Sequence, residues 1–473
     1  MIGTALAASL VGVGILSGPA LAQADQSRPA AVAAVFTKDG DAGHGLSSAF
    51  QPGTGQIVVD WNSELVAIER AAGIQPATVH PTRSYALLAT AIYDSVTSIT
   101  HAGVPYAFSV VAPHGADPVA AADQAAHDVL ADLFPSITTT APSGVTPLDQ
   151  LLANELASVP AGPGKTSGEA IGARAASLIV ALRAGDGSAA TPPTFVPTSP
   201  PAPGGYQLTP PNNAAAVFTN WGSVTPWVLT SGSQFRPPPP PPLTSPEWAA
   251  AINQVQTLGV RQEQEQQPDP VTGDTDQPST RVPTETTIAN FWAPPIWNTW
   301  NVVTDGQITQ RHLNLQQATH VLADVNLTLA DGAIGFYDAK YTYNLWRPVT
   351  AIRAGTPNNS AVNPADPDWL PQPANGATAA DPSYPAAHAT ESAAAAAVLT
   401  AFFGNEPVTV TTGAAGTSPR SFPNFAAAAA EAGQSRIFAG QHTSIDVNAG
   451  SALGAQIAGF VLAQPFGAGH ADG

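Results

Sequence analysis

A run of six consecutive prolines, residues 237–242, most constrains how this 473-residue chain folds. It ends a proline-rich stretch, residues 186–245, that also holds Pro201-Ala202-Pro203 and Pro210-Pro211. Proline has no backbone N–H and clashes with the preceding turn of a helix, so the hexaproline run cannot be helical. We expect an extended connector on the surface, with regular structure on either side of it.

Both flanking halves show the spacing of helices. Trp61, Leu65 and Ile68 follow helical periodicity in the first half, and alanine-rich blocks at 393–397 and 426–430 favour helix in the second. No clear strand alternation appears. The second half is predicted to contain helices at 307–340, 387–403, 421–438 and 442–463, with a turn at Asp305-Gly306. We therefore predict an all-α protein, one large helical domain of two packed helix bundles with a long Pro-rich connector.

Residues 1–24 have the features of a signal peptide. An apolar run from Ala5 to Leu16 precedes Gly18-Pro19-Ala20-Leu21-Ala22, which has the small-x-small form of a cleavage site. The usual Lys or Arg before the run is missing, and a buried N-terminal helix is the alternative. The expected location is secreted or periplasmic/extracellular. The predicted divisions after the signal peptide are an N-terminal bundle at 58–185, the connector and loops at 186–284, and a C-terminal bundle at 285–465.

Charge and cysteine content exclude several classes of function. A net charge of -18, with only 16 Lys plus Arg, argues against nucleic acid and anionic membrane surfaces as partners. The absence of Cys excludes disulfides and thiolate metal sites. Lys38, Lys165 and Lys340 are the only lysines, so a lysine that falls within a motif is harder to explain as an ordinary solvent-exposed side chain.

Three short stretches of the second half carry the ionisable residues that form a pattern. In the first, Lys340 and Arg347 are seven residues apart and Pro348 follows. Seven residues are about two helical turns, so both side chains can project from one face if the helix continues to Trp346. Two unrelated surface cations are the alternative interpretation of this pair.

The other two stretches centre on histidines. Pro385-Ala386-Ala387-His388 opens an alanine-rich helix, so His388 falls in its first turn, where backbone N–H groups attract anions. Ser435-Arg436 precedes His442 and Asp446, which stand at i and i+4, so on a helix Asp446 can fix the tautomer of His442. A structural histidine and a simple helix salt bridge are the respective alternatives.

Taken together, the stretches resemble the signature of the vanadium-dependent haloperoxidase and type 2 phosphatidic acid phosphatase superfamily. The residues around the motifs look most like those of its bacterial haloperoxidase branch. That signature reads K-x6-R-P, then P-S-G-H, then S-R-x5-H-x3-D. The first and third elements match in every residue and spacing. In the middle element Ala386 and Ala387 replace Ser and Gly.

The resemblance implies a role for each matched residue. Lys340, Arg347 and Arg436 would hold the oxygens of a vanadate, His442 would bond its metal, Asp446 would orient His442, and His388 would handle protons. Ala387 keeps a backbone N–H as donor to the oxyanion. Ala386 lacks the family's hydroxyl, a loss on the order of 1.5–3 kcal/mol if nothing replaces it.

The function implied first is a haloperoxidase that uses vanadate and hydrogen peroxide to oxidise halide, with a small organic acceptor. The alternative is an acid phosphatase of the same superfamily, in which His442 attacks phosphorus through a phosphohistidine and His388 protonates the leaving alcohol. A non-enzymatic relative that keeps the fold is the third possibility. Asp381, seven before His388, stands where chlorinating relatives tend to carry an aromatic, which argues against chloride oxidation.

Overall fold

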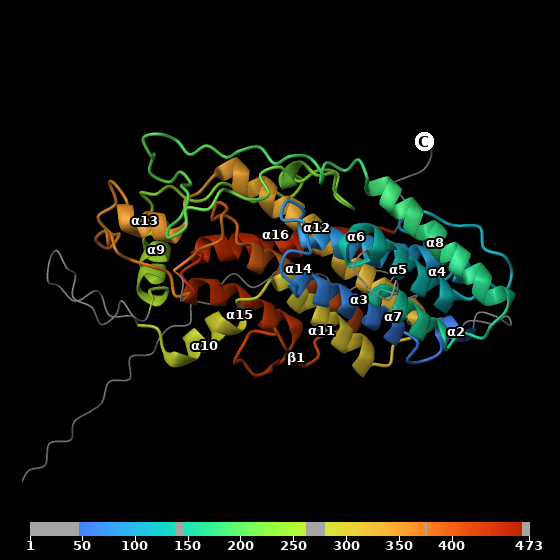
Figure 1. Cartoon of the computed structure of the whole chain (residues 1–473). Coiled ribbons are helices and arrows are strands. Elements are labelled where there is room, and N and C mark those ends of the chain that lie inside the picture. The colour runs from blue at the N-terminus through green and yellow to red at the C-terminus, as the bar shows by residue number, and fades with distance from the viewer. Residues whose placement is uncertain (1–46, 139–145, 262–279, 374–375, 466–473) are drawn as a thin grey trace, which may run out of the picture.

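The computed structural model describes residues 47–138, 146–261, 280–373 and 376–465. The predicted signal peptide lies outside these residues. Helices dominate the described chain, in agreement with the predicted fold class (Figure 1). The first half forms α2 (Ser47–Phe50), α3 (Gln56–Arg70), α4 (Pro81–Thr100), α5 (Pro118–Leu133), α6 (Pro135–Thr138), α7 (Pro147–Leu156) and α8 (Pro163–Arg183).

Local sequence explains where several of these helices begin. Proline occupies the first position of α4, α5, α7 and α8, where its missing N–H and fixed φ cost nothing. Asp117 accepts from the backbone N–H groups of Val119 and Ala120 at the start of α5. Thr146 and Asp149 cap α7 reciprocally. Capping of this kind places each helix start on a defined residue.

The connector region is irregular at the prolines but not throughout. Residues 237–242 carry no helix, as predicted. The green segment containing them runs along one edge of the molecule (Figure 1). Within residues 186–284 the structure also forms a 3-10 turn, η1 (Trp221–Ser223), and a half-buried helix, α9 (Pro246–Leu258).

The second half holds the remaining elements. Its helices are α10 (Pro283–Phe291), α11 (Ile296–Gln310), α12 (Leu315–Tyr343), α13 (Pro348–Ala354), α14 (Ala387–Phe403), α15 (Phe425–Phe438) and α16 (Ser444–Ala463). Two short antiparallel strands, β1 (Val408–Val410) and β2 (Arg420–Phe422), were not expected; Val408 stands opposite Phe422. They close the link between α14 and α15.

One predicted turn was wrong. Asp305 and Gly306 lie inside α11, and the chain turns at residues 311–314 instead. Asp305 is buried and accepts a hydrogen bond of 2.8 Å from Asn62 of α3, so it joins two helices rather than ending one. Asn314 then caps α12 through Gln317. A helix predicted at 307–340 is therefore the end of α11 followed by α12.

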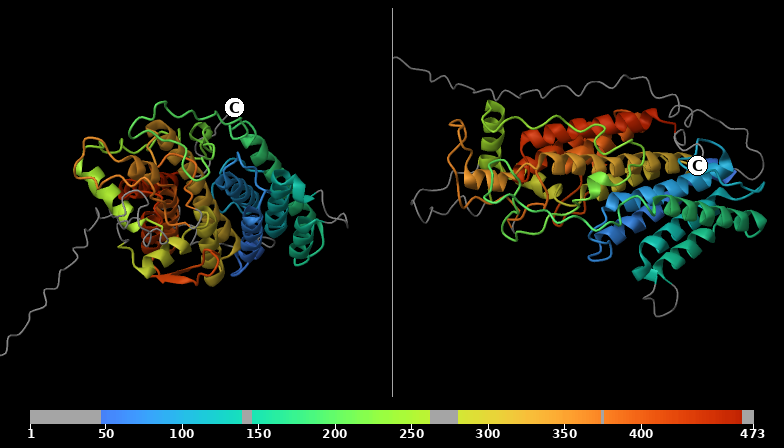
Figure 2. Two further views of the ribbon diagram at one scale, coloured as in Figure 1. Left: turned by 60° about the vertical axis from the view of Figure 1, so that its left-hand side comes forward. Right: turned by 90° about the horizontal axis from the view of Figure 1, so that it is seen from above.

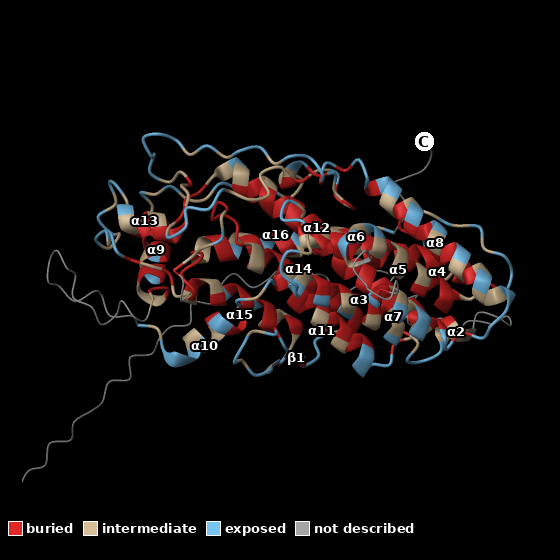
Figure 3. Ribbon diagram, viewed as in Figure 1, coloured by how far each residue is buried: buried red, intermediate tan, exposed pale blue. Residues whose placement is uncertain are grey.

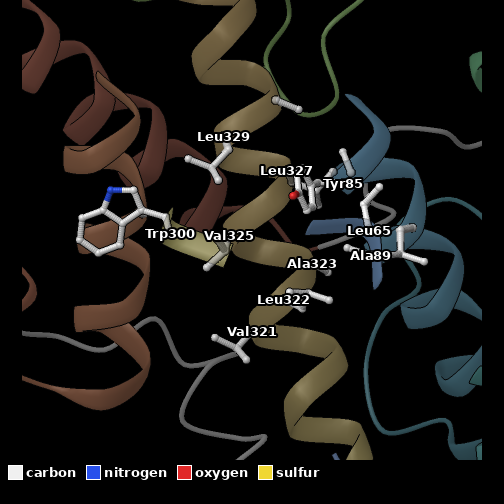
Figure 4. Packing of buried hydrophobic residues seen from close by; sticks show 14 of the residues in the cluster. Leu65, Tyr85, Ala89, Trp300, Val321, Leu322, Ala323, Val325, Leu327 and Leu329 are labelled. Carbon is white, nitrogen blue, oxygen red and sulfur yellow. The ribbon is translucent and has the colours of Figure 1, made fainter. Parts of the chain in front are cut away.

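The central helix α12 joins the two halves into one domain. It packs against α4 of the first half and against α14 and α16 of the second. Figure 4 shows Leu65, Tyr85 and Ala89 on one side of α12 and Trp300 on the other. These residues belong to one continuous hydrophobic core, which appears as buried ribbon through the middle of the molecule (Figure 3). Figure 2 shows the blue-to-teal helices gathered beside the yellow-to-red ones.

The closest helix contact brings two of the motif stretches together. A Cβ added to Gly454 of α16 would lie 2.0 Å from the backbone oxygen of Thr390 on α14, and one on Gly450 would lie 2.5 Å from the oxygen of Ala386. Only glycine permits such an approach of backbones. The backbone N–H of Ala386 also donates to the oxygen of Asp446 at 3.0 Å. The start of α14 is thereby fixed beside the start of α16.

Helix α16 alone among the described helices is long and apolar enough to cross a membrane by length and composition. Leu453, Ile457 and Val461 on one side of α16 are buried, and α16 packs against α14.

Candidate active site

Lys340 and Arg347 meet at one place, although not in the way predicted. Lys340 lies in the last turn of α12, but that helix ends at Tyr343, and Asn344 turns the chain with a left-handed φ of 52°. Arg347 is extended and precedes Pro348, the first residue of α13. The condition that the helix continues to Trp346 is therefore not met. Both cations are nevertheless fully buried and reach the same carboxylate.

That carboxylate is Asp381. Its Oδ1 lies 3.0 Å from Nζ of Lys340 and also pairs with Nη2 of Arg347. The backbone around it is held as well. Nε of Arg347 donates to the backbone oxygen of Asp381 at 2.8 Å, and Nζ of Lys340 donates to the backbone oxygen of Pro382. Two buried positive charges thus share one buried negative charge.

Arg347 also connects this pair to His442. Its Nη1 lies 3.0 Å from the backbone oxygen of Gln441 and 3.0 Å from Nε2 of His442. A guanidinium only donates, so Nε2 is the accepting nitrogen and the ring proton is on Nδ1. The lone pair of His442 therefore points into the group of cations.

The other ring nitrogen faces Asp446 and Ser383. Nδ1 of His442 lies 3.5 Å from Oδ2 of Asp446 and 3.5 Å from Oγ of Ser383. The same Asp446 oxygen accepts from Oγ of Ser383 and from the backbone N–H of Thr443, both at 2.8 Å. His442 precedes α16, whose N-cap is Thr443, so the pair does not form within a helix as predicted. It forms across the helix start instead.

Arg436 and His388 complete the set. Nε of Arg436, in the last turn of α15, is buried and has no hydrogen-bond partner among the residues that the structure describes. His388 is the second residue of α14, in the first turn as predicted, and its Nε2 lies 3.1 Å from the oxygen of Trp292. Ala387 opens that helix, and its N–H is one of those for which a helix offers no acceptor.

Burial and neighbouring charges shift the pKa of nearly every group here. Burial, with the charges of Arg347, Lys340 and Arg436, holds the pKa of His442 well below its usual range, so the ring is neutral. Burial and the charge of Arg436 do the same to the pKa of His388. Burial alone would raise the pKa of Asp381, but Lys340 and Arg347 outweigh it and lower that pKa to about 2. Burial lowers the pKa of Lys340 to about 8.

The residues present fit a small tetrahedral oxyanion. The unpartnered Nε of Arg436 is a buried donor that lacks an acceptor, and such a group costs about 1–3 kcal/mol unless something accepts from it. A neutral imidazole with its lone pair among cations suits a bond to the central atom of such an anion. Among the described residues, no group of three His, Asp or Glu side chains forms an ordinary cation site.

Two residues of this constellation escaped the motif analysis. Asp381 lies seven residues before His388 but belongs to none of the three motif elements, and neither does Ser383. Ser383 is placed by a backbone bond of 2.9 Å from its N–H to the oxygen of Leu345, between α12 and α13. The spacing of residues along the sequence does not predict such a contact between loops. The only available signal was a hydroxyl three residues before Ala386, where the family's Ser is missing.

Comparison with known proteins supports the resemblance. Residues 320–465 match a family model described as the VCPO second helical-bundle domain. No curated protein matches the sequence significantly. A solved bacterial vanadium-dependent iodoperoxidase is similar over 87% of this chain and 96% of its own, with a TM-score of 0.66 and 23% identity.

A second structure is more distant. The holo form of a bacterial vanadium-dependent chloroperoxidase is similar over 84% of this chain and 94% of its own, with a TM-score of 0.56 and 14% identity. The likeness at these identities is one of fold. The family model covers the stretch that contains Lys340, Arg347, His388, Arg436 and His442. Residues 320–465 thus match the second helical-bundle domain of this family model, and the chain shares its fold with bacterial vanadium-dependent haloperoxidases of known structure.

Proposed function

We propose that this protein is a vanadate-dependent peroxidase that oxidises halide with hydrogen peroxide, and that iodide is the halide it oxidises most readily. The observation that carries the proposal is the lone pair of His442, which faces Arg347 within a buried group of cations. Iodide is chosen because it is the most easily oxidised of the three halides, and because the fold is shared with an iodoperoxidase of known structure.

Each residue has a defined task in this proposal. Vanadate, when bound, supplies the Lewis acidity that activates hydrogen peroxide. Arg347 and Arg436 neutralise the oxyanion, with Lys340 beside them, and the N–H of Ala387 donates to it. Nε2 of His442 is the ligand atom, and Asp446 and Ser383 keep the ring proton on Nδ1. His388, neutral at rest and located at the start of α14, moves a proton during turnover.

The test compares activities on the same vanadate-loaded protein. We expect peroxide-dependent oxidation of iodide that requires vanadate, weaker oxidation of bromide, and little hydrolysis of an aryl phosphate. His442→Ala should abolish the oxidation and leave the helical circular dichroism unchanged. His114→Ala changes an exposed histidine far from the motifs and serves as the matched control.

Other outcomes would replace the proposal. Aryl phosphate hydrolysis without halide oxidation would identify a phosphatase that uses the same His442 as nucleophile. Absence of both activities in a folded protein that binds vanadate would indicate a binding protein. Full activity in His442→Ala would show that the ligand is assigned to the wrong residue.

A further inference from the structure

Asp381 is an unusual neighbour for an anion site. The residue is only 5% exposed, and its Oδ1 bonds to two of the three cations that the proposed oxyanion would need. Asp381 therefore cancels one of the three positive charges before any anion enters. The third cation, Arg436, has its Nε without a partner in the described part of the chain.

The carboxylate is also fixed in place. Arg347 donates to the backbone oxygen of Asp381, Lys340 donates to that of Pro382, and Ser383 donates from its backbone to Leu345. Three successive residues are thus tied to the last turn of α12 and to the segment that follows it. A side chain on such a segment remains beside a bound anion rather than leaving the site.

A carboxylate that remains in the site discriminates between anions by their protons. An ionised carboxylate can only accept hydrogen bonds, so it repels an oxyanion whose oxygens are all bare. It accepts a short, charge-assisted hydrogen bond from an oxyanion that carries an O–H group. At neutral pH phosphate and vanadate carry at least one proton, whereas sulfate and molybdate carry none.

We propose that Asp381 is the residue that sets the anion specificity of this site, by selecting tetrahedral oxyanions that carry a proton and rejecting those that are fully deprotonated. This inference rests on the oxyanion site proposed above. Asp381 is not a ligand of the central atom in this scheme. It shares Lys340 and Arg347 with the anion and accepts the anion's proton-bearing oxygen.

Equilibrium binding measured by calorimetry tests this directly, without turnover. The wild-type protein should bind phosphate and orthovanadate at least about tenfold more tightly than sulfate and molybdate, the size expected for one charged hydrogen bond gained or one repulsion added. In Asp381→Asn the amide no longer repels a bare oxygen. Sulfate and molybdate should therefore bind at least about tenfold more tightly to this variant than to the wild-type protein. Asp368→Asn, which changes an exposed carboxylate, should keep the wild-type order.

The comparison of molybdate with vanadate controls for size, and circular dichroism checks the fold of each variant. If Asp381→Asn does not fold, the order of the four anions in the wild-type protein still decides the matter. Equal binding of protonated and bare anions, or an order unchanged in a folded Asp381→Asn, overturns the inference and leaves the proposed function standing. Failure of the wild-type protein to bind any of the four overturns both.

Discussion

At the scale of single residues, Arg347 is the side chain that links Asp381 to His442. Its guanidinium donates to the backbone and side chain of Asp381, to the oxygen of Gln441 and to Nε2 of His442, while its residue is 1% exposed. The rigid fork of five donors makes these simultaneous contacts possible. No single ammonium group on a flexible stem can replace it.

We therefore expect Arg347→Lys to weaken vanadate binding by at least about tenfold, because two or more charged hydrogen bonds are lost. Vanadate titration followed by calorimetry gives the affinity, and thermal unfolding reports any loss of stability. Arg174→Lys makes the same exchange at an exposed position of α8 and should change neither. Wild-type affinity in Arg347→Lys would mean that charge alone is required at this position.

The motif spacing identified the residues that meet, but not the residues that hold them. Lys340, Arg347 and His442 were predicted to converge, and the contacts through Asp381 and Arg347 bring them together. Ser383 and the part played by Asp381 were not predictable, because their positions depend on loop contacts with Leu345 and Arg347. Periodicity and capping rules describe helices, and they are silent about such loops.

At the scale of helices, the sequence predicted which segments are helical better than it predicted where each helix begins and ends. The predicted helix 387–403 has the bounds of α14, because its alanine block ends at a glycine with positive φ. The supposed turn at Asp305 failed because a tertiary hydrogen bond from Asn62 compensates the buried carboxyl within α11. His442 was assigned to a helix that begins only at Ser444, since Thr443 and Asp446 form the cap.

The contact between α14 and α16 offers a test at this scale. Gly454→Ala would place a Cβ against the backbone of Thr390, so α14 must shift and carry His388 away from His442. Overpacking of this kind costs about 1–3 kcal/mol. We expect a lower melting temperature and weaker vanadate binding, measured by calorimetry of unfolding and of binding.

The same helix supplies the control for that substitution. Gly459 is exposed on α16, and a Cβ there would meet nothing within 4 Å. Gly459→Ala should therefore stabilise the protein by about 0.5–1 kcal/mol, the usual gain from alanine in a helix. If both alanine variants behave alike, the close approach of α14 and α16 does not position the site.

At the scale of the whole molecule, several carboxyl groups outside the candidate site are buried among the described residues. Burial raises the pKa of Asp123 and of Glu69 to about 8, and that of Asp94 to about 7. In the folded protein these groups keep their protons at pH values where the unfolded chain has lost them. The folded state is then favoured by lowering the pH through this range, and the net charge of -18 adds self-repulsion that lowering the pH also relieves.

The melting temperature should therefore rise as the pH falls from about 8 to about 6.5, the upper end of the window set by these pKa values. Below that pH the buried histidines act in the opposite sense, because burial lowers the pKa of His80 to about 3 and the unfolded chain gains protons first. Asp123→Asn keeps an oxygen for the indole N–H of Trp61 but removes the titrating group, so it should flatten the rise, whereas Asp132→Asn at the surface should not. Scanning calorimetry between pH 8 and about 6.5 measures this dependence. A melting temperature that falls toward pH 6.5 in the wild-type protein would mean that these carboxyl groups are ionised in the folded state.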